Sequence, residues 1–175
     1  TYASFTVVEL VDGTAQQAGL IVGAVSLVNA GASTQAGRFT NLFQSRLRLL
    51  VWTNVLMGVG MVGFGLADSF PVAVISSLTL GIGFGLTSGL YRSVITGLVP
   101  VEFRGGLVSV SESIGRLAAT VAPILLGGII GTGSSFLGYS ASLRWAVVTA
   151  GLLGGVCGVI SILVAERSRT KVTTP

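Results

Sequence analysis

Between Asp68 and Arg92 the chain reads SFPVAVISSLTLGIGFGLTSGLY (residues 69–91), without a single charged side chain. A helix rises about 1.5 Å per residue and the hydrocarbon core of a bilayer is about 30 Å thick, so about 20 such residues cross it. Four other stretches are equally free of charge, at residues 13–37, 49–67, 117–143 and 145–165. The sequence therefore predicts an all-α membrane protein, a polytopic helical bundle with five complete spans.

The composition supports this prediction. The chain is 9% charged and 51% hydrophobic, with a mean hydropathy of +0.88, whereas a soluble domain is about 25% charged. It also holds 26 glycines, which cost a helix in water about 1 kcal/mol each but let helices approach closely in lipid. Glycines four apart recur at Gly19/Gly23, Gly81/Gly85/Gly89, Gly127/Gly131 and Gly151/Gly155. This spacing predicts closely packed helices.

The charged residues between the apolar stretches divide the chain into segments. We expect the end of a truncated transmembrane helix over residues 1–10. Complete transmembrane helices are expected over 16–37, 49–67, 71–99, 105–130 and 143–165. Loops are expected at 38–48 and 100–104 on the cytoplasmic side and at 131–142 outside, with a cytoplasmic tail over 166–175.

The sidedness follows from the basic residues, which gather in the loops of one side. They are Arg38, Arg46, Arg48, Arg104, Arg167, Arg169 and Lys171. The opposite side holds Asp12, Asp68 and Arg144. Loops rich in Lys and Arg stay in the cytoplasm. The sequence therefore predicts a multi-pass protein of the cell membrane whose C-terminus is cytoplasmic.

One turn and the helix after it resemble a known family. Residues 99–106 (VPVEFRGG) are followed by Gly115-Arg116-Leu117 and by APILLGG at 122–128. This order is similar to the region of the tenth and eleventh helices in the major facilitator superfamily, where a P-x-x-x-R-G turn precedes a helix with a central polar or basic residue. The resemblance implies the C-terminal six-helix half of an alternating-access transporter, with its first helix truncated and its N-terminal half missing.

A second, weaker likeness is the segment that runs from Gly37-Arg38 to Arg46. It is similar to the loop after the family's eighth helix, a copy of the G-x-x-x-D-R-x-G-R-R loop. Asn41 stands in the acidic place, Leu42 in the following basic place and Gln44 in the place of the second Gly. This departure argues against a charge-relay role for the loop and leaves Arg38 and Arg46 as determinants of topology.

Two ionisable residues inside a predicted span are the leading site candidates. Glu112 and Arg116 stand four apart in the order that favours a helical ion pair. In a helix that starts near Gly105 they lie about 10 and 17 Å from its start, with Arg116 near the midplane. One hypothesis is that they line a substrate pathway. The alternative is that the span begins at Leu117 and leaves both at the interface.

Four further residues are candidates for the same pathway. Tyr91 and Arg92 lie near the inner end of the span over 71–99, where the alternative is that Arg92 snorkels to the headgroups. Asn29 and Gln35 lie on the first complete span. They could line a cavity, or bond between helices for packing alone.

The residue inventory excludes several functions. With no His and one Cys, the chain offers no His-based catalysis, no metal site built on these ligands and no intrachain disulfide. We therefore expect no enzyme, no cofactor and no metal. The basic residues flank apolar spans, which argues against a nucleic-acid partner. The expected function is secondary active transport of a small molecule across the lipid bilayer, with proton-coupled efflux left open. The alternative is a channel or a non-transporting structural membrane protein.

Overall fold

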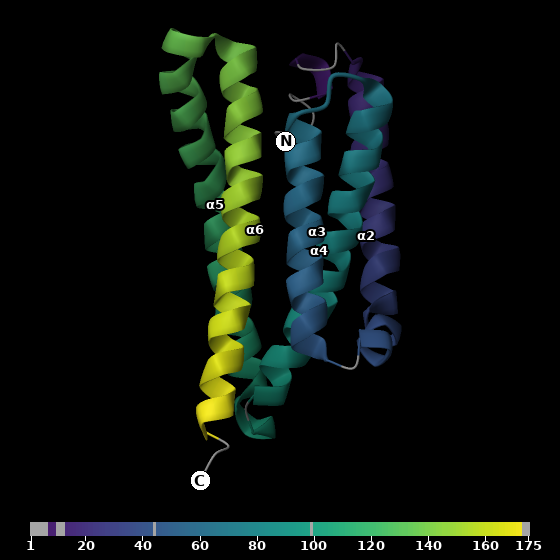
Figure 1. Ribbon diagram of the computed structural model, residues 1–175, viewed down its shortest axis with the longest axis vertical. Coiled ribbons are helices and arrows are strands. Elements are labelled where there is room, and N and C mark those ends of the chain that lie inside the picture. Colours follow the sequence, from purple (N-terminus) through teal and green to yellow (C-terminus); the bar gives the residue numbers. More distant parts are fainter. Residues whose placement is uncertain (1–6, 10–12, 44, 99, 173–175) are drawn as a thin grey trace.

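The computed structural model describes residues 7–9, 13–43, 45–98 and 100–172, and these form helices and short connections without a strand. The helices are α2 (Ala15–Phe43), α3 (Arg46–Gly65), α4 (Phe70–Leu98), α5 (Arg104–Leu137) and α6 (Tyr139–Val172), with a 3₁₀ turn η1 (Val101–Phe103) before α5. They run up and down side by side (Figure 1). This arrangement confirms the predicted all-α bundle. The truncated helix predicted over residues 1–10 lies mostly outside the described residues.

Four of the helical segments are long and apolar enough to cross a membrane: Arg46–Gly65, Phe70–Val94, Val101–Leu137 and Tyr139–Val164. They correspond to four of the five predicted spans. The fifth, over residues 16–37, is helical within α2 but is not among the four. Its amides and hydroxyls, such as those of Gln16, Asn29 and Gln35, lower its hydropathy although it carries no charge. The membrane crossing of α2 stays a prediction.

Two segments that the sequence predicted to be loops are largely helical. Over 38–48, α2 continues to Phe43 and α3 already begins at Arg46. Over 131–142, α5 continues to Leu137, and only Gly138, at φ 82°, separates it from α6.

Polar residues are accommodated at the end of α5 because their hydroxyls bond to carbonyls within the helix. Thr132, Ser134 and Ser135 donate to carbonyls three or four residues earlier at 2.7–2.9 Å, so they need no water. The C-terminal tail predicted from residue 166 is likewise helical as far as Val172. The ends predicted for α5 and α6 relied on polarity, and they therefore come too early in the chain.

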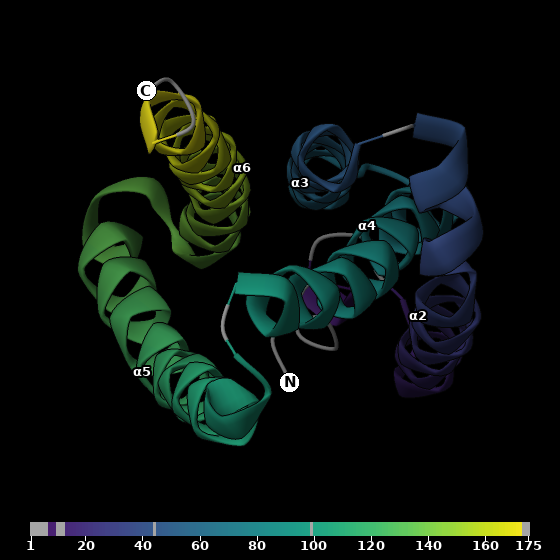
Figure 2. The ribbon, with the colours of Figure 1, turned by 90° about the horizontal axis from the view of Figure 1, so that it is seen from below.

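The packing order places α4 and α3 at the centre of the bundle. α4 packs against α2 and α3, while α6 packs against α3 and α5. From below, α2 and α5 lie at opposite edges (Figure 2). Glycines mark the closest approaches: a Cβ at Gly60 of α3 would lie 2.6 Å from the Leu80 nitrogen of α4, and one at Gly58 would lie 3.3 Å from the Gly151 carbonyl of α6. Of the glycines four apart in the sequence, those of α4 and α6 also make close contacts, whereas a Cβ at Gly19, Gly23 or Gly131 would meet no atom within 4 Å.

The connections alternate between the two ends of the bundle (Figure 1). The α2–α3 and α4–α5 connections share one end with the end of α6, and the α3–α4 and α5–α6 connections share the other. At this second end Arg144 of α6 forms an ion pair with Asp68 (Nη1–Oδ1 2.7 Å). The pair neutralises Arg144, the basic residue that the predicted topology places outside. The cytoplasmic location of the first end stays a prediction.

Candidate functional site

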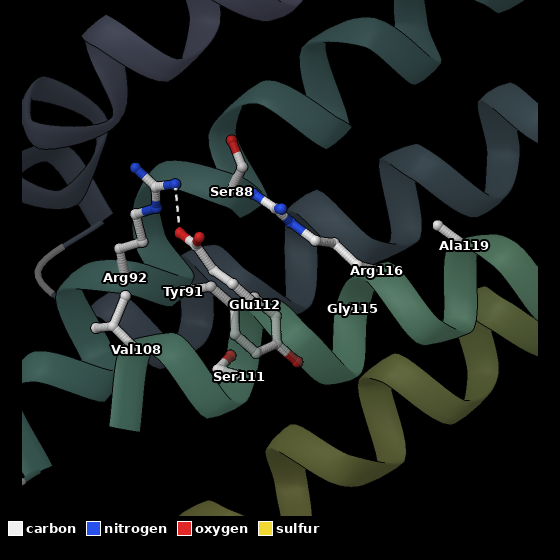
Figure 3. A pocket seen from close by; sticks show the side chains of 9 residues that line it. All are labelled: Ser88, Tyr91, Arg92, Val108, Ser111, Glu112, Gly115, Arg116 and Ala119. Carbon is white, nitrogen blue, oxygen red and sulfur yellow. Dashed lines mark hydrogen bonds and ion pairs between the residues drawn. The ribbon is translucent and has the colours of Figure 1, made fainter. Parts of the chain in front are cut away.

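A pocket of about 420 Å³ lies between α4 and α5. Its lining comprises Ser88, Tyr91 and Arg92 from α4, and Val108, Ser111, Glu112, Gly115, Arg116 and Ala119 from α5 (Figure 3). The structure thus brings together four of the six residues that the sequence analysis selected. They are Tyr91, Arg92, Glu112 and Arg116.

The helical repeat explains why these residues share a pocket. On α4, Ser88 precedes Tyr91 and Arg92 by three and four residues, which puts all three on one face. On α5 the lining residues from Val108 to Ala119 also recur every three or four positions. Ser88 and Ser111 were missed by the sequence analysis. Their spacing from Arg92 and Glu112 is the signal that could have found them.

An ion pair joins the two helices at the side of this pocket nearer the α4–α5 connection. Arg92 Nη2 lies 2.6 Å from Glu112 Oε1, with the two side chains 73% and 41% exposed (Figure 3). The sequence suggested that Glu112 pairs with Arg116 within α5, and this is wrong. A guanidinium from α4 comes within charge-assisted hydrogen-bond distance of the carboxylate instead. Arg92 therefore connects α4 to α5.

Arg116 lines the same pocket one helical turn beyond Glu112. Its side chain extends from α5 toward Ser88 of α4 (Figure 3). Ser88 Oγ donates to the Gly85 carbonyl at 2.9 Å, so its lone pairs can still accept. No carboxylate of the described residues forms an ion pair with Arg116. Its guanidinium is thus available to a ligand.

The depth of Arg116 differs somewhat from the sequence-based expectation. Because α5 extends to Leu137, its 34 residues are centred between Thr120 and Val121. Arg116 then lies about 7 Å from the helix centre, on the side of the N-terminus of α5. The pocket therefore lies in the half of the bundle nearer the α4–α5 connection rather than at its middle.

The chemistry of the lining is polar and weakly cationic. Two guanidinium groups face one carboxylate, so the charged side chains sum to +1 (+2 − 1). The hydroxyls of Ser88, Tyr91 and Ser111 add groups that both donate and accept. Such a set can hold a small polar molecule through several hydrogen bonds. Among the described residues no three His, Cys, Asp or Glu side chains cluster as metal ligands would.

Asn29 and Gln35 do not belong to this pocket. Both lie on α2, at the opposite edge of the bundle from α5, and both are partly buried. The backbone of Asn29 lies against Gly85 of α4, where a Cβ would be 3.0 Å from the Asn29 Cα. This contact fits the packing alternative for Asn29. A pathway role for either residue stays a prediction.

Comparison with known proteins agrees with the geometry. The sequence model of the Major Facilitator Superfamily matches residues 2–175, a range that includes α2 to α6 and the pocket. A D-xylose transporter of Levilactobacillus brevis is 26% identical over 153 residues, which cover 87% of this chain and 32% of that protein. The chain thus spans about a third of the length of this curated relative.

Proposed function

The chain belongs to the major facilitator superfamily, and from this premise we propose that it forms the C-terminal part of an alternating-access transporter whose substrate passes the α4–α5 pocket. The superfamily match bears out the resemblance seen around residues 99–106. In such carriers the substrate is held between two helical halves that rock about it. We propose that the other half comes from the missing N-terminal part of the same protein.

The observation that carries this proposal is the charged pocket itself. A charged side chain within a membrane costs at least about 2.5 kcal/mol, and it is tolerated where it faces a cavity or a counter-charge. Arg92, Glu112 and Arg116 all line one pocket, and two of them form an ion pair. Charges at the interface alone would not need to converge from two helices. The convergence therefore favours the pathway hypothesis.

For the substrate we propose a small sugar. A sugar presents hydroxyls that donate and accept at the same time, and the pocket offers both kinds of partner in Glu112, Arg116 and the three hydroxyl residues. Its volume of about 420 Å³ lies within the range of about 300–1,000 Å³ that is usual for small-molecule sites. The similarity to a D-xylose transporter supports a sugar rather than a drug as the substrate class.

We further propose that the end with the α2–α3 and α4–α5 connections faces the cytoplasm of the cell. The supporting observation is the cluster of arginines at this end, including Arg38, Arg46 and Arg104. A cysteine replacing Ser45 should react with a membrane-impermeant thiol reagent only from inside, and one replacing Ser69 only from outside. Labelling of both cysteines from the same side would contradict the topology.

The transport proposal is tested by counterflow of labelled D-xylose in vesicles that contain the whole protein. Exchange acceleration by unlabelled sugar is expected of a carrier and not of a channel. Arg116→Ala should lower transport at least about tenfold, because a charge-assisted hydrogen bond contributes about 1.5–3 kcal/mol. Arg116→Lys should retain part of it, since it keeps the charge but loses the planar fork. Glu112→Gln should also lower transport.

The matched control is Arg48→Ala, which removes a guanidinium from α3 outside the pocket. It should express and transport like the unmodified protein. Full transport by Arg116→Ala at normal expression would show that the pocket is not part of the substrate pathway. Absence of D-xylose exchange in the unmodified protein, together with exchange of another solute, would contradict the sugar assignment alone.

A further inference from the structure

A second pocket lies at the inner ends of α2, α3 and α4, outside the proposed substrate pathway. It has a volume of about 500 Å³. Its polar lining comprises Thr34, Arg38, Thr40 and Asn41 from α2, Arg46 from α3 and Ser93 from α4. Three helices therefore contribute hydrogen-bonding groups to one concavity near the α2–α3 connection.

This pocket holds two positive charges and no negative one. No Asp or Glu lines it, and neither Arg38 nor Arg46 forms an ion pair with a described residue. Arg46 Nη1 donates to the Ser93 carbonyl at 3.5 Å, which leaves most of its five N–H donors free. Asn41 lines the pocket in the place where the related loop carries an acid. The two guanidinium groups thus share a cavity without a counter-charge.

We propose that this pocket binds the phosphate group of an anionic ligand. A phosphate oxygen pair matches the planar fork of arginine, and two guanidinium groups can hold one phosphate from two sides. Asn41 can add amide donors that a phosphate accepts. Binding also removes the repulsion between two like charges in one pocket.

The position favours a phospholipid headgroup as the source of the phosphate. The pocket lies at the ends of the helices, where headgroups surround a membrane protein, and basic pockets between helices at the cytoplasmic side are known to take anionic headgroups. Two α2 residues next to the lining arginine and asparagine, Phe39 and Leu42, are 40% and 75% exposed. They provide apolar surface for the acyl chains. Free inorganic phosphate is the other source of the same chemistry.

This inference does not depend on the proposed transport function. A bound phosphate would link α2 to α3 and α4 at one end of the bundle, whereas the substrate is assigned to the pocket between α4 and α5. The site could therefore exist in a protein with any substrate, and its test needs no transport assay.

The test measures binding of a fluorescent phosphatidylglycerol to the purified whole protein in neutral detergent. Arg38→Gln and Arg46→Gln should each weaken binding about tenfold, because each removes a charge-assisted contact. The matched control is Arg48→Gln, the same change two residues beyond Arg46 on α3 but outside the pocket. It should change binding less than about twofold. Arg46→Lys should keep more binding than Arg46→Gln, since the charge remains.

Competition distinguishes the sources. Displacement by unlabelled phosphatidylglycerol but not by millimolar inorganic phosphate or phosphatidylcholine would support the site as a lipid site. Displacement by inorganic phosphate as well would support a site for the phosphate group itself.

Equal losses in the Arg38, Arg46 and Arg48 variants would overturn the proposal, because the attraction would then be a general surface charge effect. Binding of phosphatidylcholine as tight as that of phosphatidylglycerol would overturn it too. Thermal unfolding without lipid checks that each variant is folded.

Discussion

The two helices that form the proposed substrate pocket are held in different ways. α4 lies between α2 and α3, and its glycines meet them closely: a Cβ at Gly83 would lie 2.9 Å from the Met57 nitrogen of α3, and one at Gly81 would lie 3.1 Å from the Val25 carbonyl of α2. On α5, by contrast, a Cβ at Gly115, Gly128 or Gly131 would meet no atom within 4 Å. The exceptions to this contrast are Gly97 on α4, with no atom within 4 Å, and Gly133 on α5, whose Cβ would lie 3.0 Å from the Ser142 Oγ of α6.

Within this chain α4 is therefore the packed wall of the pocket, and α5 is the wall whose surface is largely uncovered. In the most apolar window of α4, 33% of residues are buried, against 6% in that of α5. α5 is attached to the bundle mainly through α6, and it meets α4 through the pocket and the Arg92–Glu112 pair. Under the proposed function, we expect the uncovered face of α5 to pack against the other half of the transporter.

The largest effect should come from filling a glycine on α4. In Gly85→Val the new Cβ would clash with the Asn29 carbonyl and lie 2.9 Å from the Ala32 Cβ, so α2 must move away. Overpacking of this kind lowers the free energy of unfolding by about 1–3 kcal/mol. Thermal unfolding of the purified protein in detergent, together with the yield of folded protein, measures the loss.

Gly128→Val is the matched change on α5. It introduces the same β-branched side chain into a helix but meets no neighbour within 4 Å in this chain. It should leave the stability of residues 1–175, expressed alone, nearly unchanged. In the whole protein it should lower the stability if the other half packs against this face of α5. Equal destabilisation of the isolated chain by both substitutions would show that α4 is no more tightly held than α5.

Much of the fold could be predicted because charge and apolar length decide which segments can cross a bilayer. The helices lie where the uncharged stretches are, and Gly81, Gly85 and Gly151 make the expected close contacts. Helix ends were harder to predict, because a serine or threonine can bond to its own helix and need not begin a loop. The absence of charge over residues 16–37 does not make this segment as apolar as the other four, because absence of charge is not the same as absence of polar groups.

Some residues of the pocket could be predicted from the sequence because of the helical repeat. Residues three or four apart share a face whatever the tertiary structure, so Tyr91 and Arg92 stay together, as do Glu112 and Arg116. That the two pairs meet each other depends on how α5 packs beside α4, which no local pattern encodes. For the same reason the sequence suggested the wrong partner for Glu112 and could not separate Asn29 from the others.

A smaller effect on stability is expected from the Arg92–Glu112 ion pair, which joins α4 to α5. Arg92→Glu alone would place two carboxylates together, and Glu112→Arg alone would gather three guanidinium groups around the pocket. Each single change should therefore destabilise the protein, and the double swap should recover most of the loss. Because both side chains are substantially exposed, the coupling energy should be only about 0.2–1 kcal/mol. A double-mutant cycle on thermal unfolding measures it.

The Asp68–Arg144 pair at the other end of the bundle is the matched control for the role of this contact. It also joins two segments through an exposed carboxylate, at 2.7 Å, and its swap should give a coupling energy of similar size. Transport should distinguish the two pairs. Reversal of Arg92 or Glu112 changes a wall of the pocket and should lower counterflow well beyond the loss of stability, whereas reversal of Asp68 or Arg144 should lower it only as far as folding is impaired. If both pairs affected transport alike, the Arg92–Glu112 pair would be a structural tie like the Asp68–Arg144 pair, because a contact in the proposed pathway should lower counterflow beyond the loss of stability.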